Sequence, residues 1–155
     1  MTFQIHGLDR QTFAPLFELS DADLAAHRAV RVTVDAKPGF PDRIALRDAE
    51  PGETLLLVNY EHQGADSPYR SSHAVYVSQT ATEAALKVDS LPPYFTSRSI
   101  SLRAFDGNGM ILRAELVDGA GAAPVIEAML ADPKAAYLHA HFAKYGCFAA
   151  RVDRA

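Results

Sequence analysis

The 155-residue chain is 48% hydrophobic and 22% charged, which is typical of a folded domain and excludes a largely disordered protein. Its length fits one domain, so we expect residues 1–155 to form a single globular unit around a hydrophobic core. The formal net charge is −4 and the Lys and Arg residues are scattered, which excludes nucleic acid as a partner, because phosphate binding requires clustered basic side chains.

The N-terminal third predicts two strands, one helix and a long loop. Residues 2–6 alternate apolar and polar side chains, as a half-buried strand does. Ser20 is placed to cap a short helix, because its hydroxyl can accept a hydrogen bond from the first turn. Residues 30–34 alternate valine with polar residues and predict a second strand. Residues 37–52 contain three prolines and predict an ordered loop with one short strand at Ile44–Leu46.

The middle of the chain predicts two more strands, and a helix follows further on. Residues 54–60 are apolar on both faces, which is typical of a central strand, and residues 73–78 predict a neighbouring one. Pro124 suits the first turn of a helix, and apolar residues on one side continue it to Leu130. We expect this helix to cover the sheet.

A hairpin is predicted from Ser99–Asp106 and Met110–Val117, with Gly109 in the left-handed conformation. A three-residue loop places apolar residues of the two strands opposite one another. The expected pairs are Ala104 with Leu112, Leu102 with Ala114, and Ile100 with Leu116. The elements together predict an α+β fold: a single domain with a largely antiparallel, curved sheet of about seven strands and two or three short helices packed on it.

A second hairpin is predicted from Ala136–Ala143 and Cys147–Asp153, closed by Gly146. Its register also brings apolar side chains together on one face. The expected pairs are Phe142 with Phe148, Ala140 with Ala150, and Leu138 with Val152.

The opposite face of this hairpin carries the first candidate site. The register places His139 opposite Arg151 and Cys147 diagonal to His141, with Tyr137 on the same face. Imidazole and thiolate ligands suit zinc, and three protein ligands are enough for a catalytic zinc site. Without a metal, a neighbouring imidazole or guanidinium can activate Cys147 as a nucleophile. The alternative is a face of satisfied polar residues with a buried, inert thiol.

A second group of polar residues follows the strand at residues 54–60. It comprises Glu61 and His62 and, after a loop, Arg70 and His73. Pockets commonly open at such strand ends, and Arg70 can give a carboxylate two hydrogen bonds. The alternative is a solvated loop held by one exposed ion pair.

Nothing in the sequence indicates export or membrane insertion. Residues 1–12 lack the basic and apolar segments of a secretory signal, and the longest plainly apolar stretch, Leu55–Val58, is far shorter than the ~20 residues of a membrane helix. The single cysteine forbids an internal disulfide and suits a reducing compartment. We therefore expect a cytoplasmic protein without a membrane partner.

Six segments resemble a bacterial family of uncharacterised proteins, the domain-of-unknown-function family numbered 1203. They are Lys37–Pro41, Asp48–Glu53, Asn59–His62, Ser67–Arg70, His139–Phe142 and Tyr145–Cys147. The resemblance extends over nearly the whole chain. It implies a single domain and supplies no activity, cofactor or catalytic residue.

Three hypotheses for the function follow from these patterns. The first is a small-ligand binding domain whose site combines the final hairpin with the loops after Tyr60. Its expected contacts are Tyr60, His62, Arg70, Tyr137, His139, His141, Cys147 and Arg151. The second is a small metal- or thiol-dependent enzyme in which His139, His141 and Cys147 are the catalytic or zinc-binding residues. The third is a homodimeric protein-interaction module that pairs through its sheet edges.

Overall fold

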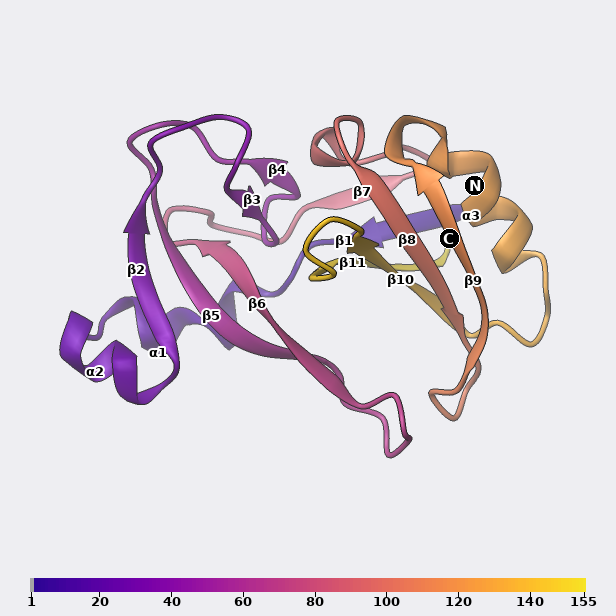
Figure 1. Cartoon of the computed structure of the whole chain (residues 1–155), viewed down its shortest axis with the longest axis horizontal. Helices are drawn as coiled ribbons and strands as arrows, with labels where there is room; N and C mark the ends of the chain where they lie inside the picture. The colour runs from indigo at the N-terminus through magenta and orange to yellow at the C-terminus, as the bar shows by residue number, and fades with distance from the viewer. Residues whose placement is uncertain (1) are drawn as a thin grey trace.

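The computed structural model describes residues 2–155 and contains two β-sheets (Figure 1). Sheet A has six strands, in the spatial order β7 (Leu86–Val88), β1 (Phe3–His6), β11 (Phe148–Arg154), β10 (Tyr137–Phe142), β8 (Ser99–Phe105) and β9 (Ile111–Asp118). Sheet B has five, in the order β2 (Ala29–Thr33), β5 (Thr54–Gln63), β6 (Ser71–Ser78), β3 (Pro41–Asp42) and β4 (Arg47–Asp48). Neighbouring strands are antiparallel except β3 and β6, which share one parallel bridge. The predicted α+β class is confirmed.

The strands are more numerous than the roughly seven that the sequence patterns predict, and they divide between two sheets. The additional strands β3, β4 and β7 have only two or three residues each, which is too short to show an alternating pattern. The helices are α1 (Ala14–Phe17), α2 (Asp21–Ala26) and α3 (Ala122–Leu130), with 3-10 turns at Arg10–Thr12, Pro93–Phe95 and Gly119–Gly121. Over residues 2–155, no helix has the length and apolar character needed to cross a membrane.

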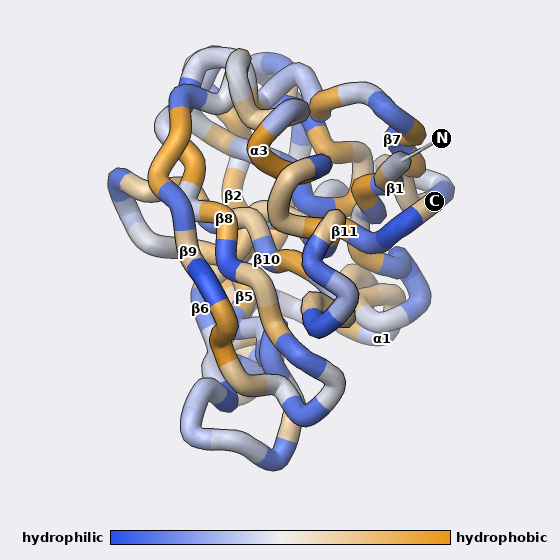
Figure 2. The backbone as a smooth tube through the Cα atoms, turned by 90° about the vertical axis from the view of Figure 1, so that its right-hand side faces the viewer, coloured by the Kyte–Doolittle hydropathy of each residue, from blue (hydrophilic) through white to orange (hydrophobic). Residues whose placement is uncertain are grey.

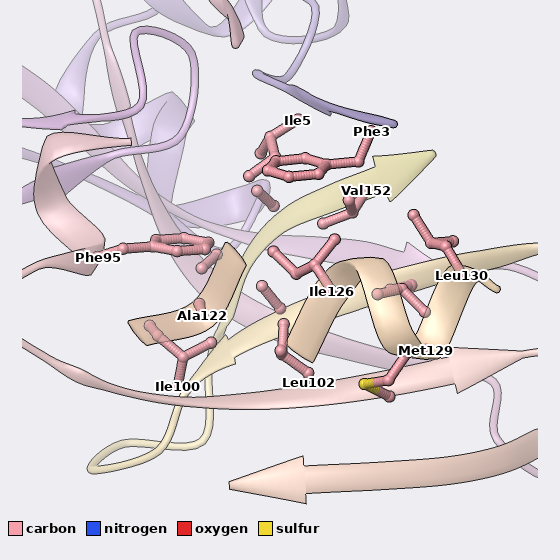
Figure 3. Packing of buried hydrophobic residues seen from close by; sticks show 14 of the residues in the cluster. Phe3, Ile5, Phe95, Ile100, Leu102, Ala122, Ile126, Met129, Leu130 and Val152 are labelled. Carbon is pink, nitrogen blue, oxygen red and sulfur yellow. The ribbon is translucent and has the colours of Figure 1, made fainter. Parts of the chain in front are cut away.

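Helix α3 covers one face of sheet A and forms the larger hydrophobic core (Figure 3). Ile126 and Met129 of α3 belong to the same buried cluster as Ile100 and Leu102 of β8, and each is at most 1% exposed. Full burial of such a side chain contributes about 1.5–3 kcal/mol to stability. The structure confirms both the predicted helix and its position over the sheet.

A second core joins sheet B, the N-terminal helices and one residue of sheet A. Leu56 and Val58 of β5 and Val75 and Val77 of β6 pack there with apolar residues of α1 and α2. Phe148 of β11 belongs to the same cluster. Phe148 therefore links the two sheets.

Residues Ile44–Leu46 form a tight turn, not the short strand that the sequence predicts. Asp42 Oδ1 accepts a hydrogen bond from the Ile44 N–H (2.9 Å), and the Asp42 carbonyl accepts one from the Leu46 N–H (2.9 Å). Leu46 has a φ of 57°, in the left-handed region. The side chain of Asp42 thus turns the chain, and β3 and β4 pair on either side of the turn.

The β8–β9 hairpin forms with the predicted left-handed Gly109 (φ 76°), but its register differs from the prediction by one residue. A bulge next to Phe105 causes the shift. The observed pairs are Ile100 with Val117, Leu102 with Glu115 and Ala104 with Arg113. Because β9 is an edge strand, Arg113 can reach water beside the core, while Leu116 turns to the opposite face.

The buried carboxylate of Asp42 allows a test of this arrangement. In addition to the hydrogen bond from the Ile44 N–H, it accepts hydrogen bonds from the backbone N–H groups of Ala45 and Ser78. Replacing Asp42 with Ala leaves three N–H groups unpaired, so we expect the free energy of unfolding to fall by about 3 kcal/mol or more. Denaturant unfolding measures this loss. Asp42→Asn, which keeps one acceptor oxygen, should lose less.

The matched control is Asp35→Ala, because Asp35 is exposed. An equal effect of Asp42→Ala and Asp35→Ala on the unfolding free energy would contradict this account of the turn.

Candidate functional site

A β-bulge in the final hairpin decides which side chains reach the site. The pairs Leu138 with Val152 and Ala140 with Ala150 are as predicted, but His141 pairs with Phe148, so the register shifts after Ala140. The predicted pair Phe142 with Phe148 does not form, and the Phe142 N–H instead donates to the Cys147 carbonyl. The shift sends Phe148 and Cys147 to the faces opposite those predicted.

Four histidines from both sheets meet beside Phe148. His62 comes from β5, His73 from β6, and His139 and His141 from β10. The ring of His62 lies 4.7 Å from that of His73, 4.9 Å from that of His141 and 5.7 Å from that of His139. It also stacks on Phe148 at 5.2 Å. The structure thus brings the two groups of polar residues in the sequence into one cluster.

Three of these histidines each have one buried ring nitrogen without a hydrogen-bond partner among residues 2–155. The atoms are His62 Nδ1, His139 Nδ1 and His141 Nε2. The other nitrogen of His141, Nδ1, carries the hydrogen, because it lies 2.9 Å from the Gly146 carbonyl oxygen and a carbonyl oxygen can only accept a hydrogen bond. His62 Nε2 lies 2.7 Å from His73 Nδ1. A buried polar atom left unpaired costs about 1–3 kcal/mol, so three in one cluster need an explanation.

The three histidines also have the spacing of a metal-ligand group. His62, His139 and His141 each offer one ring nitrogen, and the three nitrogens lie within 4.8 Å of one another. His139 and His141 are 2% and 0% exposed. The side chains therefore converge on one point in a protected environment.

The electrostatic environment keeps these imidazoles neutral. Burial is the main cause, and it lowers the pKa of His62 to about 4 and the pKa values of His139 and His141 to about 3. Nearby positive charge, including that of Arg103, lowers these pKa values further. Burial also lowers the pKa of His73. Near neutral pH each of these imidazoles therefore has one ring nitrogen with a free lone pair, which is the form that binds metals.

Arg103 is a cation beside the histidines that the sequence patterns do not identify. It lies opposite His139 in the β8–β10 register and thus on the same face of sheet A. Its Nε donates to Ser101 Oγ at 3.3 Å, and within residues 2–155 its two Nη atoms have no hydrogen-bond partner. Burial lowers the pKa of Arg103, and no carboxylate opposes this effect. The only signal in the sequence is the alternation of Ser101 and Arg103 with apolar residues of β8.

A cleft of about 1110 Å³ opens next to the cluster and is lined by residues of both sheets and of the final hairpin. His73 is the residue of the cluster that lines it, and the cationic side chains in the lining are those of Arg43, Arg98 and Lys144. No Asp or Glu belongs to the lining within the part of the chain that the structure describes. Arg98 is held by the carboxylate of Asp48 at 2.6 Å.

Cys147 does not join the histidines. The bulge places it with the core cluster on the other face of sheet A, beside the buried side chain of Arg43. Arg43 donates through Nη2 to Cys147 Sγ (3.1 Å), through Nε to the Phe148 carbonyl and through Nη1 to the Pro41 carbonyl. The predicted diagonal contact between Cys147 and His141 is therefore wrong, because one extra residue in β11 reverses the direction of Cys147 while His141 stays on the face of His139.

The remaining predicted contacts on the final hairpin are engaged by neighbouring residues. Arg151 pairs with His139 across the strands, as predicted, but its guanidinium binds Asp153 at 2.8 Å and lies over the ring of Tyr137 at 4.1 Å. The Tyr137 hydroxyl is bonded to Gln63 Nε2 at 2.9 Å. A ligand contact by Arg151 or Tyr137 stays a prediction.

The residues around the β5–β6 loop divide between surface and core. Arg70 forms a largely exposed ion pair with Glu61 at 3.1 Å, which agrees with the alternative of a solvated loop. Tyr60 packs in the second core, with its ring 5.7 Å from that of Phe13. His62 and His73 face the histidines of the final hairpin through ring contacts, and the ring of Tyr60 lies 6.2 Å from that of Phe148.

Comparison with known proteins identifies a family without a described activity. A family model described as "Protein of unknown function (DUF1203)" matches residues 39–154. No curated protein and no solved structure matches the chain. The matched residues include all four histidines and Arg103.

The low pKa values of the histidines predict that metal-free protein loses stability in weak acid. In the unfolded chain a histidine takes up its proton near pH 6.5, but folded His139 and His141 take one up only near pH 3. Below pH 6.5 the unfolded state therefore binds more protons, and each of these histidines lowers the unfolding free energy by up to about 1.4 kcal/mol per pH unit. Denaturant unfolding of chelator-treated protein between pH 7.5 and pH 4.5 measures the slope.

His141→Gln should flatten this slope, whereas His27→Gln, at an exposed position, should leave it unchanged. An identical slope for His141→Gln and the unaltered protein would show that His141 does not resist protonation in the folded state.

Proposed function

We propose that this chain, which belongs to the DUF1203 family, binds a transition-metal ion through His62, His139 and His141. The observation that carries the proposal is the convergence of three imidazoles, two buried and that of His62 half-buried, each with a buried ring nitrogen that has no partner. A metal ion at this point would satisfy all three nitrogens at once. Neutral imidazole is a good ligand for zinc, copper, iron and nickel.

Zinc fits this set of ligands well, because it accepts three imidazoles and leaves a fourth tetrahedral position for water or substrate. Zinc–nitrogen bonds of about 2.0–2.1 Å place tetrahedral ligand atoms roughly 3.4 Å apart. The nitrogens, which lie within 4.8 Å of one another, would move inward by small ring rotations. The site is thus close to a binding geometry before the ion arrives.

Two hydrogen bonds around the cluster support ligation. The Gly146 carbonyl holds His141 with Nε2 free, and His73 contacts the nitrogen of His62 that faces away from the unpaired one. Such outer contacts orient ligating histidines and select their tautomers. Through Gly146, the conformation of the final hairpin would set the orientation of the His141 ring toward the metal ion.

An open fourth position favours a catalytic role over a structural one, because structural zinc sites normally have four protein ligands. A bound ion would lower the pKa of a water molecule or polarise an oxygen of a substrate that enters from the cleft. We therefore propose a small metal-dependent enzyme. The competing hypothesis is that the histidines only fill space between the sheets.

Metal titration separates these hypotheses. We expect chelator-treated protein to bind one equivalent of zinc or cobalt in equilibrium dialysis with elemental analysis. Replacing any one of His62, His139 or His141 with Gln should weaken binding by at least about 100-fold, because two imidazoles alone make a poor site. His27→Gln is the control at an exposed position and should bind like the unaltered protein.

Binding that is absent, or that is unchanged in all three Gln variants, would exclude the proposed metal site and favour a packing role. Circular dichroism of each variant establishes that a loss of metal is not a loss of folding.

A second candidate function, self-association, is favoured by the edge strand β9. Within residues 2–155 this strand pairs only with β8, and Leu116 on it is 72% exposed. Figure 2 shows the alternation of apolar and polar residues along β9. Two copies aligned antiparallel about Ala114 would place Arg113 opposite Glu115 and Leu112 opposite Leu116. Both pairings are favourable across neighbouring strands, so the strand is complementary to itself.

This candidate predicts a concentration-dependent dimer in sedimentation velocity experiments. Leu116→Glu should weaken it by about tenfold or more, since the substitution removes an apolar pair and adds a repelling charge. The matched control is Leu86→Glu, at an exposed leucine of β7 on the opposite edge of sheet A. A monomer at all concentrations, or an equal effect of both variants, would contradict pairing through β9.

A further inference from the structure

The proposed metal site has no protein carboxylate to balance its charge. The proposed ligands are three histidines, and imidazole binds a metal ion in its neutral form, so these ligands add no negative charge. A divalent ion bound there would keep both positive charges. In a partly buried site, uncompensated charge is costly unless a counter-ion is bound.

Arg103 adds a third positive charge at the same place. It lies on the same face as His139, and its charge acts on all four histidines of the cluster. Its Nη1 and Nη2 groups are uncommitted over residues 2–155. A planar guanidinium with two free Nη groups is suited to donate a pair of hydrogen bonds to one oxyanion.

The acidic residues on adjacent segments do not provide the missing charge. Asp153, the acid nearest in sequence to Arg151, binds that guanidinium at 2.8 Å, and Glu61 binds Arg70 at 3.1 Å. Neither forms an ion pair with Arg103. A counter-charge for Arg103 and the metal would therefore come from a ligand.

The cleft favours the entry of such a ligand. His73 is the residue of the cluster that lines the cleft. Arg98 in the lining is paired with Asp48, and the donors of Arg43 are bonded to Phe148, Pro41 and Cys147, but Lys144 has no ion pair among residues 2–155. An unpaired cation at a cleft raises the local concentration of anions. Its volume of about 1110 Å³ is sufficient for a small molecule rather than a single ion.

We infer that the site takes a small molecule carrying an oxyanion, a carboxylate or a phosphate, which binds between the metal ion and Arg103. This inference rests on the metal site proposed above. One oxygen of the ligand occupies the open position of the ion, and Arg103 donates to the oxyanion from Nη1 and Nη2. Arg103 is then the residue that selects anionic substrates.

Cobalt-substituted protein tests the inference, because the visible absorption of cobalt(II) changes when an anion enters its coordination sphere. Inorganic phosphate and acetate are titrated separately at constant ionic strength, with perchlorate as the reference salt. We expect saturable spectral changes with phosphate or acetate and none with perchlorate. Arg103→Gln should lower the affinity for the anion by about 10- to 100-fold, since hydrogen bonds to a charged group are lost. The affinity for cobalt should stay within a few-fold, because the three imidazoles remain.

Two further variants strengthen the comparison. Arg103→Lys keeps the charge but not the paired donors and should give an intermediate anion affinity. Arg113→Gln removes an exposed arginine of β9 and should leave the cobalt and anion affinities unchanged. If Arg103→Gln proves unstable, Arg103→Lys provides the decisive comparison.

The outcomes distinguish the two proposals. Failure of the unaltered protein to bind cobalt excludes the metal site itself. Cobalt binding without any anion effect, or with equal anion affinity in the unaltered protein and both Arg103 variants, overturns the role of Arg103 and leaves the metal site intact. Tighter binding of phosphate than of acetate supports a phosphate-bearing ligand, and the reverse order supports a carboxylate.

Discussion

The β-bulge after Ala140 is the constraint on which the rest of the site depends. By adding one residue to β11, it places Phe148 on the face of sheet A that meets sheet B and turns Cys147 toward the other face. Phe148 then stacks on His62, which draws the histidines of β5 and β10 together. Without the extra residue, a thiol would point at the histidines and the apolar contact between the sheets would be lost.

The histidine cluster runs against what a stable core requires. The folded protein would be more stable with apolar side chains at this position, between two sheets and next to an aromatic ring. Unpaired buried nitrogens cost free energy that packing does not restore. The cluster contains three such nitrogens, and they belong to the three histidines that lie close enough together to hold a metal ion. Polar groups retained together at a cost are a feature of binding sites rather than of cores.

Sequence patterns predicted most helices and strands of the fold, but they predicted the register of strand pairing less well. Alternation identified β1 and β2, and Ser20 indeed caps α2 by accepting a hydrogen bond from the Asp23 N–H. Both predicted hairpins form, yet each contains a bulge that shifts its register by one residue. A bulge depends on what packs against each face of the finished sheet, which is not local information. For the same reason the candidate site was predicted with His139 and His141 but without Arg103.

The sequence by itself determined the α+β class, the position of α3 and the residue types available for chemistry. Local periodicity and turn residues suffice for these, because they act over a few neighbouring positions. The tertiary structure decided that His62, more than 70 residues from His139, would share a cluster with it, and that Cys147 would not. Contacts between distant segments depend on the packing of two sheets against each other, and a one-residue shift in a strand is enough to exchange a thiol for a phenyl ring.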